Sequence, residues 1–135
     1  MNYHQARAYL LTKPESFEDF PFGPQVAVIK VSNKMFATLG KQDTLASLNL
    51  KCEPHEAQIL RDIFPAVKPG YHMNKRHWNT IILDGSIPVG ELQRMIDNSY
   101  SLVVAGLNRA QRQALEIRHG KDTLYRCSNT GQGQE

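Results

Sequence analysis

The sequence predicts an α+β domain with two layers, in which an antiparallel sheet of about five strands is covered by helices. Two observations predict this class. Short strand-like segments follow one another with brief turns between them, and sequential hairpins favour antiparallel pairing. Longer segments with apolar residues at helical spacing are expected to cover one face of the sheet. The expected order is helix, three strands, helix, two strands and two helices.

The chain begins with a predicted helix over residues 2–13. Asn2 is a suitable cap, apolar and aromatic residues fall on one face, and Pro14 ends the helix. Residues 15–24 are predicted to form a loop, because prolines flank a glycine at its end. Three rings lie between acids in this loop and are expected to pack on the core: Phe17, Phe20 and Phe22.

Three predicted strands follow the loop. Residues 26–31 are apolar on both faces, as in a central strand, and the Ser-Asn pair at 32–33 predicts a tight turn because asparagine tolerates positive φ. Residues 35–40 form the next strand. The clearest alternation lies at 46–51, where one face is apolar and the other presents small polar groups and Lys51.

A second helix is predicted over residues 54–64. Proline suits its first position, and another proline follows its last residue. Residues 66–72 and 77–84 are expected to be two more strands, joined through the Asn-Lys pair at 74–75.

The longest predicted helix runs from Pro88 to about Gly106, and a final helix begins after the cap Asn108 and ends at Gly120. One domain is therefore expected over residues 1–120. The remaining segment, 121–135, is rich in polar residues and is expected to be disordered.

Composition sets limits on function. The 135 residues carry a net charge of +3 and a pI of about 9.0, which permits nucleic-acid binding without requiring it. No segment approaches the roughly 18 apolar residues of a membrane span, and no secretory signal is visible. The two cysteines, Cys52 and Cys127, lie far apart, as in proteins of a reducing compartment. We expect a cytoplasmic protein and a monomer.

No catalytic or metal motif stands out. His72 and His77 have no third ligand nearby, whereas zinc sites need three or four. Cys52 has no identified general base. Asp84 precedes a glycine, and a turn aspartate that binds its own backbone is favoured over a catalytic acid. No catalytic residue, metal or cofactor is predicted, and a hydrolase that uses Asp84 or Cys52 is the least favoured alternative.

The most distinctive segment is 68–78, which combines three basic side chains, two histidines and two large aromatic residues without an acid. Lysine and arginine suit phosphates, and aromatic rings offer stacking faces. We predict that this segment binds the DNA backbone as a hairpin, extended by two residues of the strand at 46–51. The predicted contact residues are Lys68, Tyr71, His72, Asn74, Lys75, Arg76, Trp78, Lys51 and Asn49.

Several motifs follow one another in order along the chain: Phe20-Pro21-Phe22-Gly23, Lys34-Met35-Phe36-Ala37, Asn49-Leu50-Lys51-Cys52, Pro69 to Thr80, Leu83 to Pro88, and Ser99-Tyr100. In this order, over about residues 2–118, the chain resembles the MmcQ/YjbR family of small bacterial proteins. The resemblance implies a fold related to frataxin-like and secretion-chaperone-like domains, and a double-wing DNA-binding function.

A second hypothesis stays open beside DNA binding, because fold analogy alone does not determine function. The same residues on an open sheet face would also suit a protein-interaction module with an acidic partner, or a module that binds a small anionic ligand.

Overall fold

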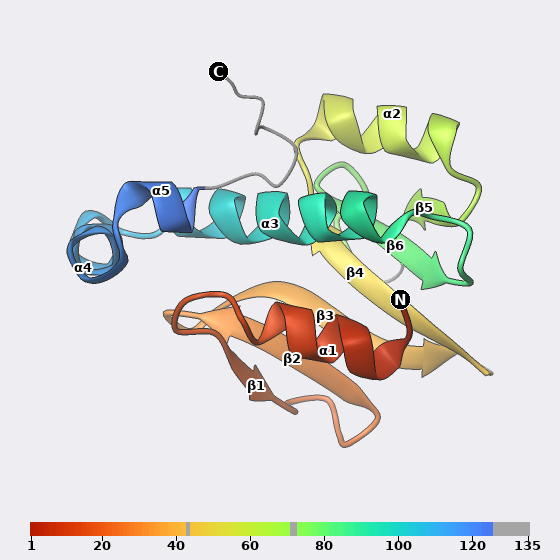
Figure 1. The fold of residues 1–135 in the computed structure, drawn as a ribbon, viewed down its shortest axis with the longest axis horizontal. Helices are drawn as coiled ribbons and strands as arrows, with labels where there is room; N and C mark the ends of the chain where they lie inside the picture. The colour runs from red at the N-terminus through yellow and green to blue at the C-terminus, as the bar shows by residue number, and fades with distance from the viewer. Residues whose placement is uncertain (43, 71–72, 126–135) are drawn as a thin grey trace.

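The computed structural model describes residues 1–42, 44–70 and 73–125, and its architecture confirms the predicted α+β class. An antiparallel sheet with strand order β1-β2-β3-β4-β6-β5 carries helices on one face (Figure 1). The strands are β1 (Phe17–Asp19), β2 (Val26–Val31), β3 (Lys34–Gln42), β4 (Leu45–Lys51), β5 (Val67–Pro69) and β6 (Trp78–Leu83). The helices are α1 (Tyr3–Leu10), α2 (Pro54–Ile63), α3 (Val89–Ala105), α4 (Arg109–His119) and α5 (Lys121–Leu124).

The sheet has one strand more than the five that were expected. The additional strand is β1, which lies in the segment 15–24 that was expected to be a loop. It pairs with β2 and is attached by two ion pairs, Arg7 to Glu18 at 2.8 Å and Lys30 to Asp19 at 2.9 Å. Because β1 covers one edge of β2, strand β2 is an inner strand, as its apolar residues indicate.

The expectation that the three phenylalanines of this segment pack on the core is wrong. Phe17 is 43% exposed, Phe20 is 44% exposed and Phe22 is 74% exposed. Phe17 belongs to an edge strand and the other two rings lie in the turn that follows it. The main contacts of the covering helices are with β2 to β6 and not with β1, so these rings remain at the surface.

The turn between β2 and β3 forms as expected. Ser32 and Asn33 have φ angles of 47° and 64°, which is the left-handed conformation that a two-residue hairpin requires at both positions. A bulge between Ile29 and Lys30 shifts the register of this pair of strands. Beyond the bulge, β3 pairs with β4 and β4 pairs with β6 without a further shift.

Helices α1, α2 and α3 form the second layer. Helix α3 packs across β2, β3 and β4, α1 contacts β3, and α2 contacts β5 and β6. The core lies between these helices and the alternate strand residues that face them, such as Leu48, Leu50 and Ile81, all of which are buried. No helix of the described residues is long and apolar enough to cross a membrane.

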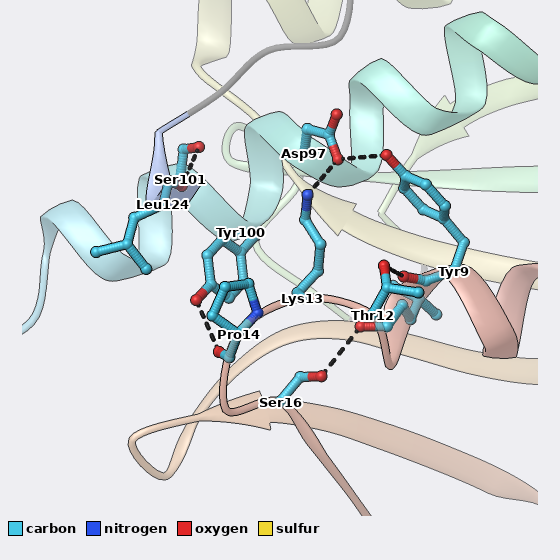
Figure 2. A network of polar contacts seen from close by, with 10 residues as sticks. Tyr9, Thr12, Lys13, Pro14, Ser16, Asp97, Tyr100, Ser101 and Leu124 are labelled. Atoms are coloured by element: carbon cyan, nitrogen blue, oxygen red, sulfur yellow. Dashed lines mark hydrogen bonds and ion pairs between the residues drawn. The ribbon is translucent and has the colours of Figure 1, made fainter. Parts of the chain in front are cut away.

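A buried polar network joins the end of α1 to α3 (Figure 2). The carboxylate of Asp97 in α3 accepts bonds from the ammonium of Lys13 and from the hydroxyl of Tyr9, 2.8 Å away. The ammonium also lies 5.6 Å from the ring centre of Tyr100, whose hydroxyl donates to the carbonyl of Pro14 at 2.8 Å. The network fixes the connection that follows α1 against the middle of α3.

The expectation that residues 121–135 are disordered is wrong for residues 121–125. Lys121–Leu124 form the short helix α5, because Leu124 is buried and its carbonyl accepts a bond from Ser101 of α3. Residues 126–135 lie outside the described residues.

Candidate nucleic-acid interface

The sheet face opposite α1, α2 and α3 is referred to as the uncovered face. Strand pairing determines which side chains share it. Lys51 lies opposite Trp78, Asn49 lies opposite Thr80, and Thr80 lies opposite Lys68. The residues between them, such as Leu50 and Ile81, point into the core. Three strands therefore place predicted contact residues on one face: Asn49, Lys51, Lys68 and Trp78.

The centre of this face is a ladder of hydrogen bonds. The amide nitrogen of Asn49 donates to the hydroxyl of Thr38 at 2.8 Å, and the amide oxygen accepts from the hydroxyl of Thr80. The ladder crosses β3, β4 and β6. Because both ends of the Asn49 amide are occupied, this side chain orders the sheet face, and its role in DNA contact stays a prediction.

The tip of the predicted hairpin is a compact turn. The carbonyl of Asn74 accepts from the amides of His77 and Trp78, and the side-chain oxygen of Asn74 accepts from the amide of Arg76 at 3.0 Å. The side chains of Asn74, Lys75 and Arg76 are exposed. Two other predicted contact residues, Tyr71 and His72, lie outside the described residues.

Gly70 allows the two strands of the hairpin to meet. Its amide donates to the carbonyl of Trp78 at 2.9 Å, and a Cβ atom at this position would lie 2.8 Å from the Cβ of Trp78. Such a contact is too short for any side chain. Glycine is therefore required where β5 ends beside the start of β6.

Arg61 of α2 holds the turn from the helix side, and sequence analysis did not identify it. Its Nε donates to the side-chain oxygen of Asn79 at 2.7 Å. Its terminal nitrogen donates to the carbonyls of Lys75 and Trp78. The available signal was its position four residues after Ala57, on the stripe of α2 that faces the sheet. One guanidinium thus fixes three points of the hairpin.

Four cations belong to this hairpin and to the end of β4 that pairs with it, and we call Lys51, Lys68, Lys75 and Arg76 the basic hairpin surface. None of them forms an ion pair with another described residue. The ion pairs of the described residues involve other cations, namely Arg7, Lys13, Lys30, Arg94 and Arg118, and His119 also contacts a carboxylate. Residues 66–83 contain no Asp or Glu, so the charge of this segment is positive.

Comparison with known proteins decides the family. A family model described as YjbR matches residues 11–102. The chain belongs to the YjbR family. The uncharacterized protein YbdF of Escherichia coli O157:H7 is 37% identical over 101 residues, which cover 75% of this chain and 81% of that protein. The uncharacterized protein YjbR of Escherichia coli K12 is 30% identical over 115 residues, which cover 85% and 98%.

Solved structures of similar proteins share the fold of this YjbR-family protein. The crystal structure of Deinococcus radiodurans protein DR2400, with domain DUF419, has a TM-score of 0.77 at 36% identity and covers 84% of this chain and 87% of its own. A crystal structure from Pseudomonas syringae has a TM-score of 0.68 at 31% identity and covers 76% and 98%. The predicted resemblance to this family is confirmed.

Ser99 and Tyr100 of α3, which the sequence resemblance singled out, have structural contacts. Ser99 is buried, and its hydroxyl donates to the carbonyl of Phe36 at 2.6 Å and accepts from the amide of Lys51 at 2.8 Å. It therefore joins β3 to β4 beside the basic hairpin surface. Tyr100 packs edge-on against Phe36, and burial raises the pKa of its hydroxyl far above the usual range.

The residues weighed for catalysis have local structural roles. The carboxylate of Asp84 accepts bonds from the amide and hydroxyl of Ser86, which is the predicted turn arrangement and lowers the pKa of Asp84. Burial, and then the charges of Glu56 and Glu53, raise the pKa of the Cys52 thiol to about 11. No group of three metal-ligating side chains is found among the described residues.

The raised pKa gives a test of Cys52 chemistry in a Cys127→Ser variant. At pH 8 the folded protein is expected to react with iodoacetamide about a hundredfold more slowly than the same protein in denaturant, because only the thiolate is nucleophilic. Mass spectrometry of samples quenched over time measures the rate. Equal rates in the folded and unfolded protein would show that the thiol is accessible and that the fold does not raise its pKa.

Proposed function

We propose that this YjbR-family protein is a non-catalytic DNA-binding domain that contacts the phosphate backbone through the basic hairpin surface. The observation that carries the proposal is the set of four cations on this hairpin and the adjoining end of β4, none paired with a described acid. A cation that is already desolvated by an ion pair gains little from a phosphate, whereas these four keep their charge available.

The rigidity of the turn supports the same proposal. Arg61 and Gly70 hold the backbone of the hairpin tip against α2 and β6, while Lys75 and Arg76 extend from it. A preordered tip loses less conformational entropy on binding than a free loop would. We therefore expect binding without a large change in the fold. We also propose that the protein acts as a monomer and in the cytoplasm.

The double variant Lys75→Ala, Arg76→Ala tests this proposal. For the natural protein, the logarithm of the affinity for duplex DNA should fall against the logarithm of salt concentration with a slope of about −3. The variant should bind at least about tenfold more weakly at low salt, with a slope that is smaller by about 2. Fluorescence anisotropy of a labelled duplex, titrated at several salt concentrations, measures both values.

The matched control is Arg109→Ala, Lys121→Ala, which removes the same charge from exposed positions on α4 and α5. Its affinity and slope should stay close to those of the natural protein. Equal losses in both variants would show that only net charge matters and would contradict a defined surface. Displacement of DNA by polyglutamate at equal charge concentration would favour the alternative, an acidic protein partner at the same surface.

A further inference from the structure

The uncovered face carries aromatic rings as well as cations, and duplex backbone contacts do not explain them. Trp78 is half-buried and lies opposite Lys51 across the β4–β6 pair, where paired Cα atoms are about 5 Å apart. Lys68 lies opposite Thr80, so it is a diagonal neighbour of Trp78 on the same face, at about 7–8 Å. The Trp78 ring therefore lies between Lys51 and Lys68 on this face.

A second exposed ring lies at the other edge of the sheet. Phe17 pairs with Lys30, and Phe17 shares a face with Asp19, whose carboxylate binds the Lys30 ammonium at 2.9 Å. The neighbours Ile29 and Val31 belong to the core under the helices, so Lys30 and Phe17 lie on the uncovered face. The Lys30–Asp19 ion pair neutralises the acid that would otherwise repel phosphate beside Phe17.

The two rings are far enough apart that one extended nucleic-acid strand could contact both. Strand order places three strands between β1 and β6, which is four strand spacings or about 19 Å. Bases in a duplex are stacked on each other and do not offer a face to a protein ring, whereas unpaired bases stack readily on aromatic side chains. Flanking lysines then meet the phosphates between the bases.

We infer that the uncovered face binds single-stranded nucleic acid, with one base stacked on Trp78 and another on Phe17. This inference rests on the proposed function and specifies that the nucleic acid is single-stranded. The hydrogen-bond ladder through Asn49 lies between the rings and is satisfied within the sheet, so it does not read base edges. Binding is therefore expected to tolerate different base sequences. The lysines pair equally well with the phosphates of DNA and of RNA.

Binding of a labelled 15-nucleotide thymidine strand, a 15-nucleotide uridine strand and a 15-base-pair duplex tests the inference. Both single strands should bind about tenfold more tightly than the duplex, and they should quench the fluorescence of Trp78, the only tryptophan of the chain. Phe17→Ser should weaken single-strand binding by about five- to tenfold and leave duplex binding within about twofold. Ile117→Ser, at an 84% exposed position on α4, is the matched control and should change neither.

Trp78→Leu is a second variant, to be compared only if its circular dichroism spectrum and melting temperature match those of the natural protein. Duplex binding that depends on Lys75 and Arg76, without a preference for single strands, would overturn this inference and leave the proposed function intact. Unchanged single-strand affinity in Phe17→Ser would also overturn it. Absence of binding to all three probes would contradict both.

Discussion

Replacement of Asp97 by alanine is expected to lower the free energy of unfolding by about 3–5 kcal/mol. The carboxylate is 2% exposed, and it is the described ion-pair partner of Lys13, whose side chain is itself largely buried. Its removal leaves a desolvated ammonium without a counter-charge and takes an acceptor from Tyr9. Urea denaturation followed by circular dichroism measures the change.

Two further variants separate the ion pair from simple loss of packing. Asp62→Ala removes an exposed carboxylate from α2 and should cost less than about 0.5 kcal/mol. The double variant Lys13→Met, Asp97→Leu removes both charges and should recover most of the lost stability. A loss below about 1 kcal/mol in Asp97→Ala would show that the pair contributes little to the attachment of α1 to α3.

Replacement of Arg61 by alanine should have the largest effect on the candidate interface. The guanidinium donates to Asn79, which is buried, and to two carbonyls of the turn. Because bonds from a charged group are stronger than neutral ones, we expect a loss of about 2–3 kcal/mol in unfolding free energy. Amide hydrogen exchange at 74–78 should accelerate, and DNA affinity should fall although no cation of the basic hairpin surface changes.

Arg61→Lys distinguishes positioning from charge. Lysine keeps the positive charge but lacks the planar fork that reaches three acceptors at once. If Arg61 positions the hairpin, Arg61→Lys should resemble Arg61→Ala in hydrogen exchange and in DNA affinity. Full recovery of affinity in Arg61→Lys would instead show that the residue acts through its charge alone.

The sequence predicted the parts of the fold that depend on local patterns. The alternation at 46–51 identified β4 and its exposed face, the Ser-Asn pair predicted the β2–β3 turn, and Asn108 was identified as the cap of α4. Strand β1 was missed, because three residues are too few to establish a period and its pairing with β2 is a tertiary contact. Helix α5 was missed because tertiary contacts of one residue hold it: Leu124 is buried, and its carbonyl accepts a bond from Ser101 of α3.

The candidate interface was predictable only as far as one continuous segment could show it. The charge and the aromatic content of residues 68–78 are visible in the sequence. The apposition of Lys51 and Trp78 depends on pairing between β4 and β6, which are separated by α2 and β5. Arg61 looked like an ordinary helix cation, and its bonds to the turn exist only after α2 packs on the sheet. Exposure of Phe17 likewise follows from its place at the sheet edge.

Chemical-shift perturbation of the ¹⁵N-labelled protein by a 15-nucleotide thymidine strand at low salt tests the central claim most directly. The largest shifts are predicted at the amides of 49–51, 68, 74–80 and 17, which surround the uncovered face and its hairpin. The groove between α2 and α3, which includes Ile59 and Ile63, should change little. Shifts concentrated in that groove, or no shifts with micromolar protein and excess strand, would contradict a nucleic-acid site on the uncovered face.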